Sequence, residues 1–165
     1  MKKLIILAAS AAAISTSAAA APGDTSTAQG AATAEVVAPI TLEHVNGAAL
    51  NFGIFTTGDA GGTVVVDQLG AGAATGEVSL LGNSVEAADA FTVAGDANRT
   101  FTIATTGGSV SNGSDTMNFT TNADATGALD AAGAAAFSVG GTLSVAGGES
   151  AGTYTGSYNV TVAYK

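Results

Sequence analysis

Residues 152–165 read GTYTGSYNVTVAYK and alternate large or apolar residues with small polar ones. A period of two over such a length is typical of a β-strand with one buried face. The sequence therefore predicts a single long amphipathic strand here, whose apolar face must be buried in a sheet. The positions on that face are Tyr154, Gly156, Tyr158, Val160, Val162 and Tyr164.

Short apolar alternations recur upstream of this segment, separated by Gly-rich and Asn-Gly turns. Several short strands at such spacing predict an all-β fold, an immunoglobulin-like sandwich of about seven to nine strands. The predicted strands cover residues 50–55, 63–67, 77–81, 91–94, 101–104, 117–121, 136–139 and 142–145, followed by the terminal segment.

Two dipeptides are the best candidates for tight hairpin turns. Asn112-Gly113 and Gly140-Gly141 both tolerate the positive φ that such turns require. Residues 126–136 are rich in alanine and suit one or two helical turns, although Gly127 and Gly133 favour a loop or a short cap.

The first 20 residues have the composition of a signal peptide. Lys2 and Lys3 precede an apolar run over residues 4–14, which is too short to span a bilayer, and small residues follow up to a cleavage site after Ala20. No later run approaches the roughly 18 apolar residues of a membrane helix. We therefore expect an exported protein, located in the periplasm, at the cell surface or outside the cell, whose mature chain does not insert into a membrane.

The mature chain divides into two parts. Residues 21–33 are mainly Gly, Ser, Thr and Ala without helical or strand period, and they predict a flexible N-terminal arm. Residues 34–165 form the predicted β-sandwich domain, of a size that suits one core. It begins with an extended run over residues 34–45 that Pro39 interrupts, as expected of an edge strand or a strand that changes sheets.

The charge of the mature chain excludes one class of partner. Without Lys2 and Lys3, two of the four basic residues remain against 13 acidic ones, which gives a net charge of −11. Binding to nucleic acid or to anionic lipid needs clustered Lys and Arg, so neither is expected. The chain contains no cysteine, and its stability must therefore come from strand pairing and packing.

The sequence offers little for catalysis. His44 is the single histidine, no G-x-S-x-G motif occurs, and a surface position at a strand end explains His44 more simply. The carboxylates are scattered, and the absence of Trp disfavours a glycosidase. Loop Asp and Asn residues suit Ca²⁺, but the chain has no calcium-loop motif. We expect no enzyme, no cofactor and no metal.

Five short motifs along the mature chain carry a family resemblance. They are Leu50-Asn51-Phe52-Gly53, Gly62-Thr63-Val64-Val65-Val66-Asp67, Phe91-Thr92-Val93-Ala94-Gly95, Gly141-Thr142-Leu143-Ser144-Val145 and Ala151-Gly152-Thr153-Tyr154-Thr155-Gly156. In these motifs the chain resembles an uncharacterised family of small exported bacterial β-proteins. That family has a domain of unknown function, so this likeness implies a fold and a compartment but no mechanism.

The C-terminal A-G-x-Y-x-x-x-x-x-V-x-V-x-Y pattern is similar to the ends of chaperone–usher fimbrial subunits and of spore-coat-like secreted proteins. Gly152 and Tyr164 fall on positions that serve chaperone and subunit recognition in pilins. The segment Ala34-Glu35-Val36-Val37-Ala38-Pro39-Ile40 resembles the donor extension and first strand of those subunits. The resemblance implies a sandwich that lacks one strand and accepts a neighbour's arm.

We therefore expect a non-enzymatic exported structural or surface protein, a fimbria-like subunit that assembles by donor-strand exchange with like subunits, with a periplasmic chaperone and usher as further partners. The alternative is a self-complete monomeric binding module for carbohydrate, peptide or Ca²⁺. The residues expected to carry assembly are Ala28, Ala32, Ala34 and Val36 in the arm, and Gly152, Tyr154, Tyr158, Val160, Val162 and Tyr164 in the terminal strand.

Overall fold

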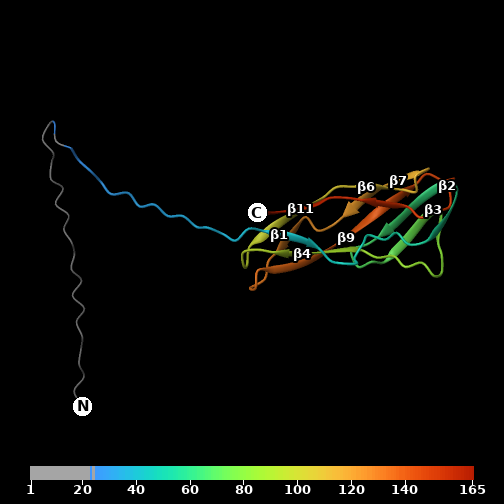
Figure 1. The fold of residues 1–165 in the computed structure, drawn as a ribbon, viewed down its shortest axis with the longest axis horizontal. Helices are drawn as coiled ribbons and strands as arrows, with labels where there is room; N and C mark the ends of the chain where they lie inside the picture. Colours follow the sequence, from blue (N-terminus) through green and yellow to red (C-terminus); the bar gives the residue numbers. More distant parts are fainter. Residues whose placement is uncertain (1–22, 24) are drawn as a thin grey trace, which may run out of the picture. The chain divides into compact units, whose positions relative to one another are not determined.

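A computed structural model describes residue 23 and residues 25–165 of the chain (Figure 1). The predicted signal peptide and its cleavage site lie outside the described residues. All strands of the described part belong to one compact unit, Val36–Lys165, and this part contains no helix. The prediction of an all-β fold is thus confirmed.

Eleven strands make up this unit, more than the seven to nine that the sequence predicts. The strands are β1 (Thr41–His44), β2 (Phe55–Val66), β3 (Gly72–Leu80), β4 (Asp89–Ala94), β5 (Thr100–Thr105), β6 (Gly108–Ser111), β7 (Thr116–Asn122), β8 (Thr126–Ala128), β9 (Ala134–Val145), β10 (Thr155–Ser157) and β11 (Val160–Tyr164). The difference from the prediction arises because the sequence does not predict β6 and β8 and the predicted terminal strand is divided into β10 and β11, whereas the predicted strands at 136–139 and 142–145 form one strand, β9.

The strands form two antiparallel sheets in a sandwich-like arrangement. The larger sheet has the order β1-β4-β9-β7-β6-β10, and β2 joins it by pairing with both β9 and β3. The smaller sheet has the order β11-β5-β8. In Figure 1, β9 runs along the middle of the unit, with β4 and β1 near the end where the chain enters and β2 and β3 near the other end.

Strand β9 connects the two ends of the larger sheet. Its first half pairs with β4, from Ala134 opposite Ala94 to Val139 opposite Asp89. Its second half pairs with β2 over residues 141–145 and with β7 over residues 140–143. β9 therefore contributes side chains to both hydrophobic cores of the domain.

The smaller core lies between the two sheets. Val93 of β4 and Phe101 of β5 are each 1% exposed, and Leu129 packs with them. Phe137 of β9 covers this core from the larger sheet, and Val162 of β11 covers it from the smaller one. Burial of such side chains contributes roughly 1.5–3 kcal/mol each.

The larger core lies under β2, β7 and the second half of β9. Its fully buried members include Val64 and Leu143, which are 0% and 1% exposed, and Phe119 packs beside them. Phe52, from the segment that precedes β2, belongs to this core, and Tyr154, from the segment that precedes β10, packs against it.

The C-terminal strand differs from the prediction, because residues 152–165 do not form one strand. β10 pairs with β6 in the larger sheet, whereas β11 pairs with β5 in the smaller one. Between them, Tyr158 packs against the larger core, and the backbone N–H of Thr106 donates to the carbonyl of Asn159 at 3.0 Å. The chain therefore changes sheets at residues 158–159 while its apolar residues keep the same alternation.

The prediction of a hairpin turn at Gly140-Gly141 is wrong. Both glycines lie inside β9, where the strand passes from its pairing with β4 to its pairing with β2 and β7. A Cβ at Gly140 would collide with the carbonyl oxygen of Val66, and one at Gly141 would lie 2.6 Å from the carbonyl oxygen of Thr120. Glycine is needed here because neighbouring backbones approach closely.

Asn112-Gly113 does form the turn of the β6–β7 hairpin, and Gly113 has a φ of 93°.

Residues 126–136 contain no helical turn: β8 occupies the start and β9 begins at Ala134, with a turn held by Asp130 between them. Residues 34–40 are not part of a strand, so the first strand is shorter than the extended run predicted around Pro39.

Candidate functional site

The arm residues expected to take part in assembly lie in irregular, exposed backbone. Ala28, Ala32 and Ala34 are exposed and belong to no strand. Val36 is 96% exposed, which is unusual for a β-branched apolar side chain. Their side chains are therefore accessible to a partner.

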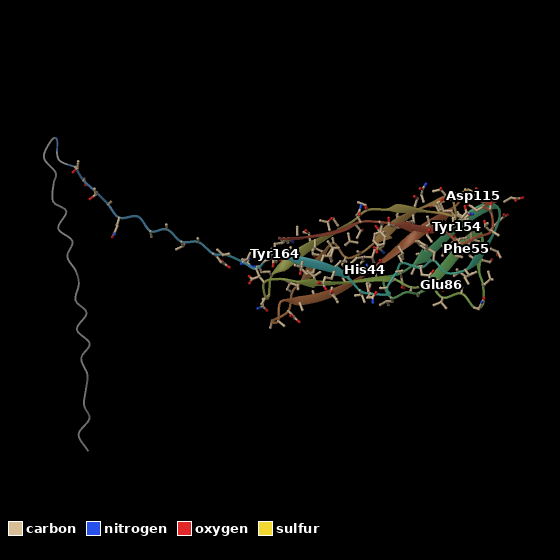
Figure 2. The ribbon with its side chains drawn as sticks, viewed as in Figure 1. His44, Phe55, Glu86, Asp115, Tyr154 and Tyr164 are labelled. Carbon is tan, nitrogen blue, oxygen red and sulfur yellow. The ribbon has the colours of Figure 1, made fainter. Side chains whose placement is uncertain are left out.

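Residues 36–40, where the N-terminal arm joins the domain, form the arm root, and Tyr164 attaches this root to the C-terminal strand. The Tyr164 hydroxyl donates to the carbonyl of Ala38 at 2.8 Å and accepts the backbone N–H of Asp96 at 2.7 Å. Ile40 packs against the smaller core, in the same cluster as the Tyr164 ring. One side chain of β11 thus fixes the point at which the arm leaves the domain, close to the labelled Tyr164 in Figure 2.

Val160, Val162 and Tyr164 have their side chains against the smaller core, as the alternation predicts. β11 pairs with β5 along one edge, from Val160 opposite Thr105 to Tyr164 opposite Phe101. Within the described residues no strand pairs with its other edge. An unpaired edge of this kind is a template for another strand.

Tyr154 lies at the other end of the domain from Tyr164, as Figure 2 shows, and Gly152 lies two residues before it in the chain. Gly152 is exposed beside Asn112. The Tyr154 hydroxyl donates to the Ser150 carbonyl at 2.8 Å and lies 3.4 Å from Oδ2 of Asp115. The sequence-predicted terminal residues therefore divide into two places: Gly152 and Tyr154 at one end, and β11 at the other.

Asp115 and Tyr154 affect each other's titration. Hydrogen bonds from Ser150, whose backbone N–H donates to Oδ2 at 2.8 Å, hold the pKa of Asp115 below its usual value. Desolvation, followed by the charge of Asp115, raises the pKa of Tyr154. Both groups are engaged in holding residues 150–154 in place.

Tyr158 and His44 both contact the buried carboxylate of Asp89, which the sequence does not indicate as important. Asp89 is 5% exposed; it accepts the Tyr158 hydroxyl at 2.8 Å and contacts Nε2 of His44 at 2.7 Å. The His44 ring also lies edge-on to Phe91, 5.1 Å between centroids. Burial, and then the hydrogen bond to Asp89, raise the pKa of Tyr158.

This cluster connects three distant parts of the chain. His44 ends β1, Asp89 begins β4, and Tyr158 lies where the chain changes sheets. In the sequence, Asp89 is one of several loop carboxylates, and only the pairing of β1 with β4 brings His44 close to it. The geometry of the cluster stabilises the fold, because Asp89 joins the end of β1 and the C-terminal segment to the start of β4. Across the described residues, no group of three His, Cys, Asp or Glu side chains could hold a metal ion.

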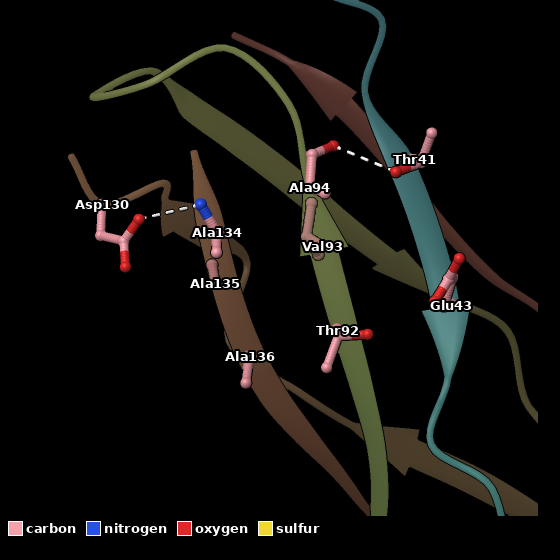
Figure 3. Close-up of a pocket in the computed structure, with 9 residues that line it drawn as sticks. All are labelled: Thr41, Glu43, Thr92, Val93, Ala94, Asp130, Ala134, Ala135 and Ala136. Carbon is pink, nitrogen blue, oxygen red and sulfur yellow. Dashed lines mark hydrogen bonds between the residues drawn. The ribbon is translucent and has the colours of Figure 1, made fainter. Parts of the chain in front are cut away.

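A shallow depression of about 480 Å³ lies on the outer face of β1, β4 and β9 (Figure 3). Its lining is mainly threonine and alanine. Two acidic residues border it, and Asp130 already accepts the backbone N–H groups of Ala132 and Ala134 at 2.8 and 2.9 Å. The other acidic residue is Glu43 of β1.

A longer groove of about 720 Å³ lies between residues 50–57 on one wall and residues 149–154 on the other. Val110, Met117 and Leu143 form its apolar floor. Glu149 stands at its edge, where its carboxylate accepts the backbone N–H of Ala146 at 2.6 Å. In Figure 2, Phe55 and Tyr154 mark the two walls.

The described residues contain no helix long and apolar enough to cross a membrane.

A family model described as a domain of unknown function, DUF4402, matches residues 40–164, which is nearly the whole folded unit. The chain belongs to the DUF4402 family. The matched region of this DUF4402 chain begins at Ile40, the first residue of the arm root that packs against a core. No curated protein and no solved structure matches the chain.

Proposed function

We propose that this DUF4402 protein is an exported, non-enzymatic structural subunit that assembles with its own copies by strand exchange, in the manner of fimbrial subunits. A segment of one copy, residues 28–37, adds to the domain of the next beside its C-terminal segment, residues 152–165. A periplasmic chaperone and an usher are the expected helpers of such a route.

The observation that carries this proposal is the combination of an exposed arm and unpaired strand edges in one chain. Residues 25–36 are exposed and form no strand, although they include Val36, whose side chain is almost fully accessible. The domain has an unpaired edge at β11. An extended segment gains backbone hydrogen bonds when it joins such an edge, and its alternate side chains set the register.

The composition of the arm favours moderate affinity of the arm for the domain of a neighbouring copy. Ala28, Ala32, Ala34 and Val36 share one face of an extended segment, and their small side chains bury little area. At about 25 cal/mol per Å² the apolar contribution is modest, so backbone pairing must supply much of the binding.

The test compares the mature chain, residues 21–165, with a chain that begins at residue 36. Native mass and thermal unfolding are measured for both. We expect oligomers from the longer chain that disappear when the arm is removed. Equally stable monomers from both chains would reject assembly by the arm and would favour the monomeric binding module.

A further inference from the structure

The groove between residues 50–57 and 149–154 has unpaired backbone on both walls. Ala151, Gly152 and Thr153 belong to no strand, and their backbone groups make no hydrogen bond within the described residues. On the other wall, residues 55–57 of β2 pair with β3 alone, because β9 begins to pair with β2 only at Gly62.

The unpaired wall of β2 follows from the geometry of antiparallel strands. Alternate residues direct both backbone groups to the same side, so part of residues 55–57 directs its N–H and C=O groups away from β3. Two unpaired backbone segments therefore border one groove, and an extended peptide between them could pair with both.

The floor of the groove fits small apolar side chains on one face of such a peptide. Val110, Met117 and Leu143 line it; Val110 is half-buried, whereas Met117 and Leu143 are only 3% and 1% exposed, so a peptide would contact mainly Val110 and the two walls. A strand placed over this floor would direct every second side chain toward it. Ala28, Gly30, Ala32, Ala34 and Val36 have that spacing and are small.

Charge restricts the occupant further. Glu149 borders the groove and Asp115 lies next to it, bonded to Ser150. Acidic peptides are therefore disfavoured. Residues 25–34 of the arm contain no charged side chain, and Glu35 falls on the face opposite Ala34 and Val36, so it would point to solvent.

The groove and the arm root lie at opposite ends of the domain. The root joins β1, whose Thr41 pairs with Ala94, and Ala94 pairs in turn with Ala134 at the start of β9. β9 then runs for 12 residues, about 35 Å, to Val145, close to Glu149 in the groove wall. The 15 residues 25–39 span at most about 50 Å, so most of this length would be used in reaching the groove of the same chain.

We infer that this groove, and not the free edge of β11, is the acceptor for the arm of a second copy. The inference rests on the proposed strand exchange and specifies its site. Since the donor leaves one end of a domain and the acceptor lies at the other, the contact is head-to-tail and does not close on itself. Copies joined in this way form an open filament.

Engineered disulfides in the mature chain distinguish the two acceptors. The chain contains no cysteine, so every disulfide would be an introduced one. Ala28, Ala32 or Val36 in the arm is replaced by cysteine, together with either Thr153 at the groove or Thr161 on β11. Both acceptor threonines are exposed, and thermal unfolding of the reduced variants verifies that each is folded.

After oxidation, the T153C series should give disulfide-linked ladders on a non-reducing denaturing gel, with at least a tenfold excess over the T161C series. Ladders from T161C instead, or an unmodified chain that assembles while neither series cross-links, would overturn the groove as acceptor and leave strand exchange standing. A monomeric unmodified chain without ladders in either series would reject both the acceptor and the proposed function.

Discussion

The Tyr158 hydroxyl donates to the carboxylate of Asp89 at 2.8 Å, across 69 positions of sequence. Tyr158 belongs to the larger core, and its ring also lies edge-on to Phe91 and Phe119, with centroids 6.4 and 6.0 Å apart. The point where the chain changes sheets is therefore fixed by both a polar bond and aromatic packing. Since Asp89 is buried, removing one of its partners leaves a carboxylate oxygen without that hydrogen bond.

Replacing Tyr158 with Phe should lower the free energy of unfolding by about 1.5 kcal/mol, the lower end for a hydrogen bond to a charged group, because Tyr158 is only half-buried. Urea unfolding measures the change. Y154F is the matched control: the Tyr154 hydroxyl lies 3.4 Å from Asp115, a carboxylate that is only partly buried, so the effect of its loss should be smaller. Equal losses in the two variants would contradict the role of the buried carboxylate.

The raised pKa of Tyr158 predicts a loss of stability at alkaline pH. The protonated phenol is favoured in the folded state, so its contribution is complete below the usual tyrosine pKa of 10. As the pH rises above 10, the unfolded chain loses this proton first, and the free energy of unfolding falls. Measurements from pH 8 to about 11.5 should show a shallower decline in Y158F than in the original chain. Parallel curves would argue against this assignment.

Replacing Gly140 with Ala should destabilise the domain by about 1–3 kcal/mol, because the new Cβ would be forced against the carbonyl oxygen of Val66 inside β9. Gly82 is the control position, since a Cβ there would meet no atom within 4 Å. Thermal unfolding of G140A and G82A gives the comparison. If the two variants melt alike, the close approach of β2 to β9 is not required.

Replacing Tyr164 with Phe removes the bond to Ala38 that holds the arm root and the bond from the Asp96 amide, while keeping the ring in the smaller core. We expect faster hydrogen exchange at the Asp96 amide and faster protease cleavage within residues 36–39, with little change in the core strands. T161V alters an exposed position of the same strand and should leave both rates unchanged. Unchanged rates in Y164F would mean that Ile40 alone holds the root.

The sequence predicts the terminal strand well where only local pattern matters. Tyr154, Tyr158, Val160, Val162 and Tyr164 are all partly buried on one face, as a period of two requires. The transfer from one sheet to the other at residues 158–159 is hidden, because the alternation continues unchanged through it. Nothing local distinguishes a strand that stays in its sheet from one that changes sheets.

The errors at other positions have long-range causes. A Gly-Gly pair suits a hairpin turn and a tightly packed strand interior equally, and the atoms that decide the matter at Gly140 belong to Val66 and Asp67. Asp89 owes both of its partners to distant parts of the chain, because β1 brings His44 beside it and the C-terminal segment brings Tyr158. The groove likewise depends on two coil segments, around Phe52 and Ala151, that are nearly 100 positions apart.

Strand β9 has a consequence for how the domain loses its structure. Phe137 belongs to the smaller core and Val145 to the larger one, and a single uninterrupted strand carries both. Neither core can melt while the other keeps β9 in place, so the two act as one cooperative unit. Calorimetric and van't Hoff enthalpies of unfolding should therefore agree for residues 36–165, although the domain contains two separate clusters of buried side chains.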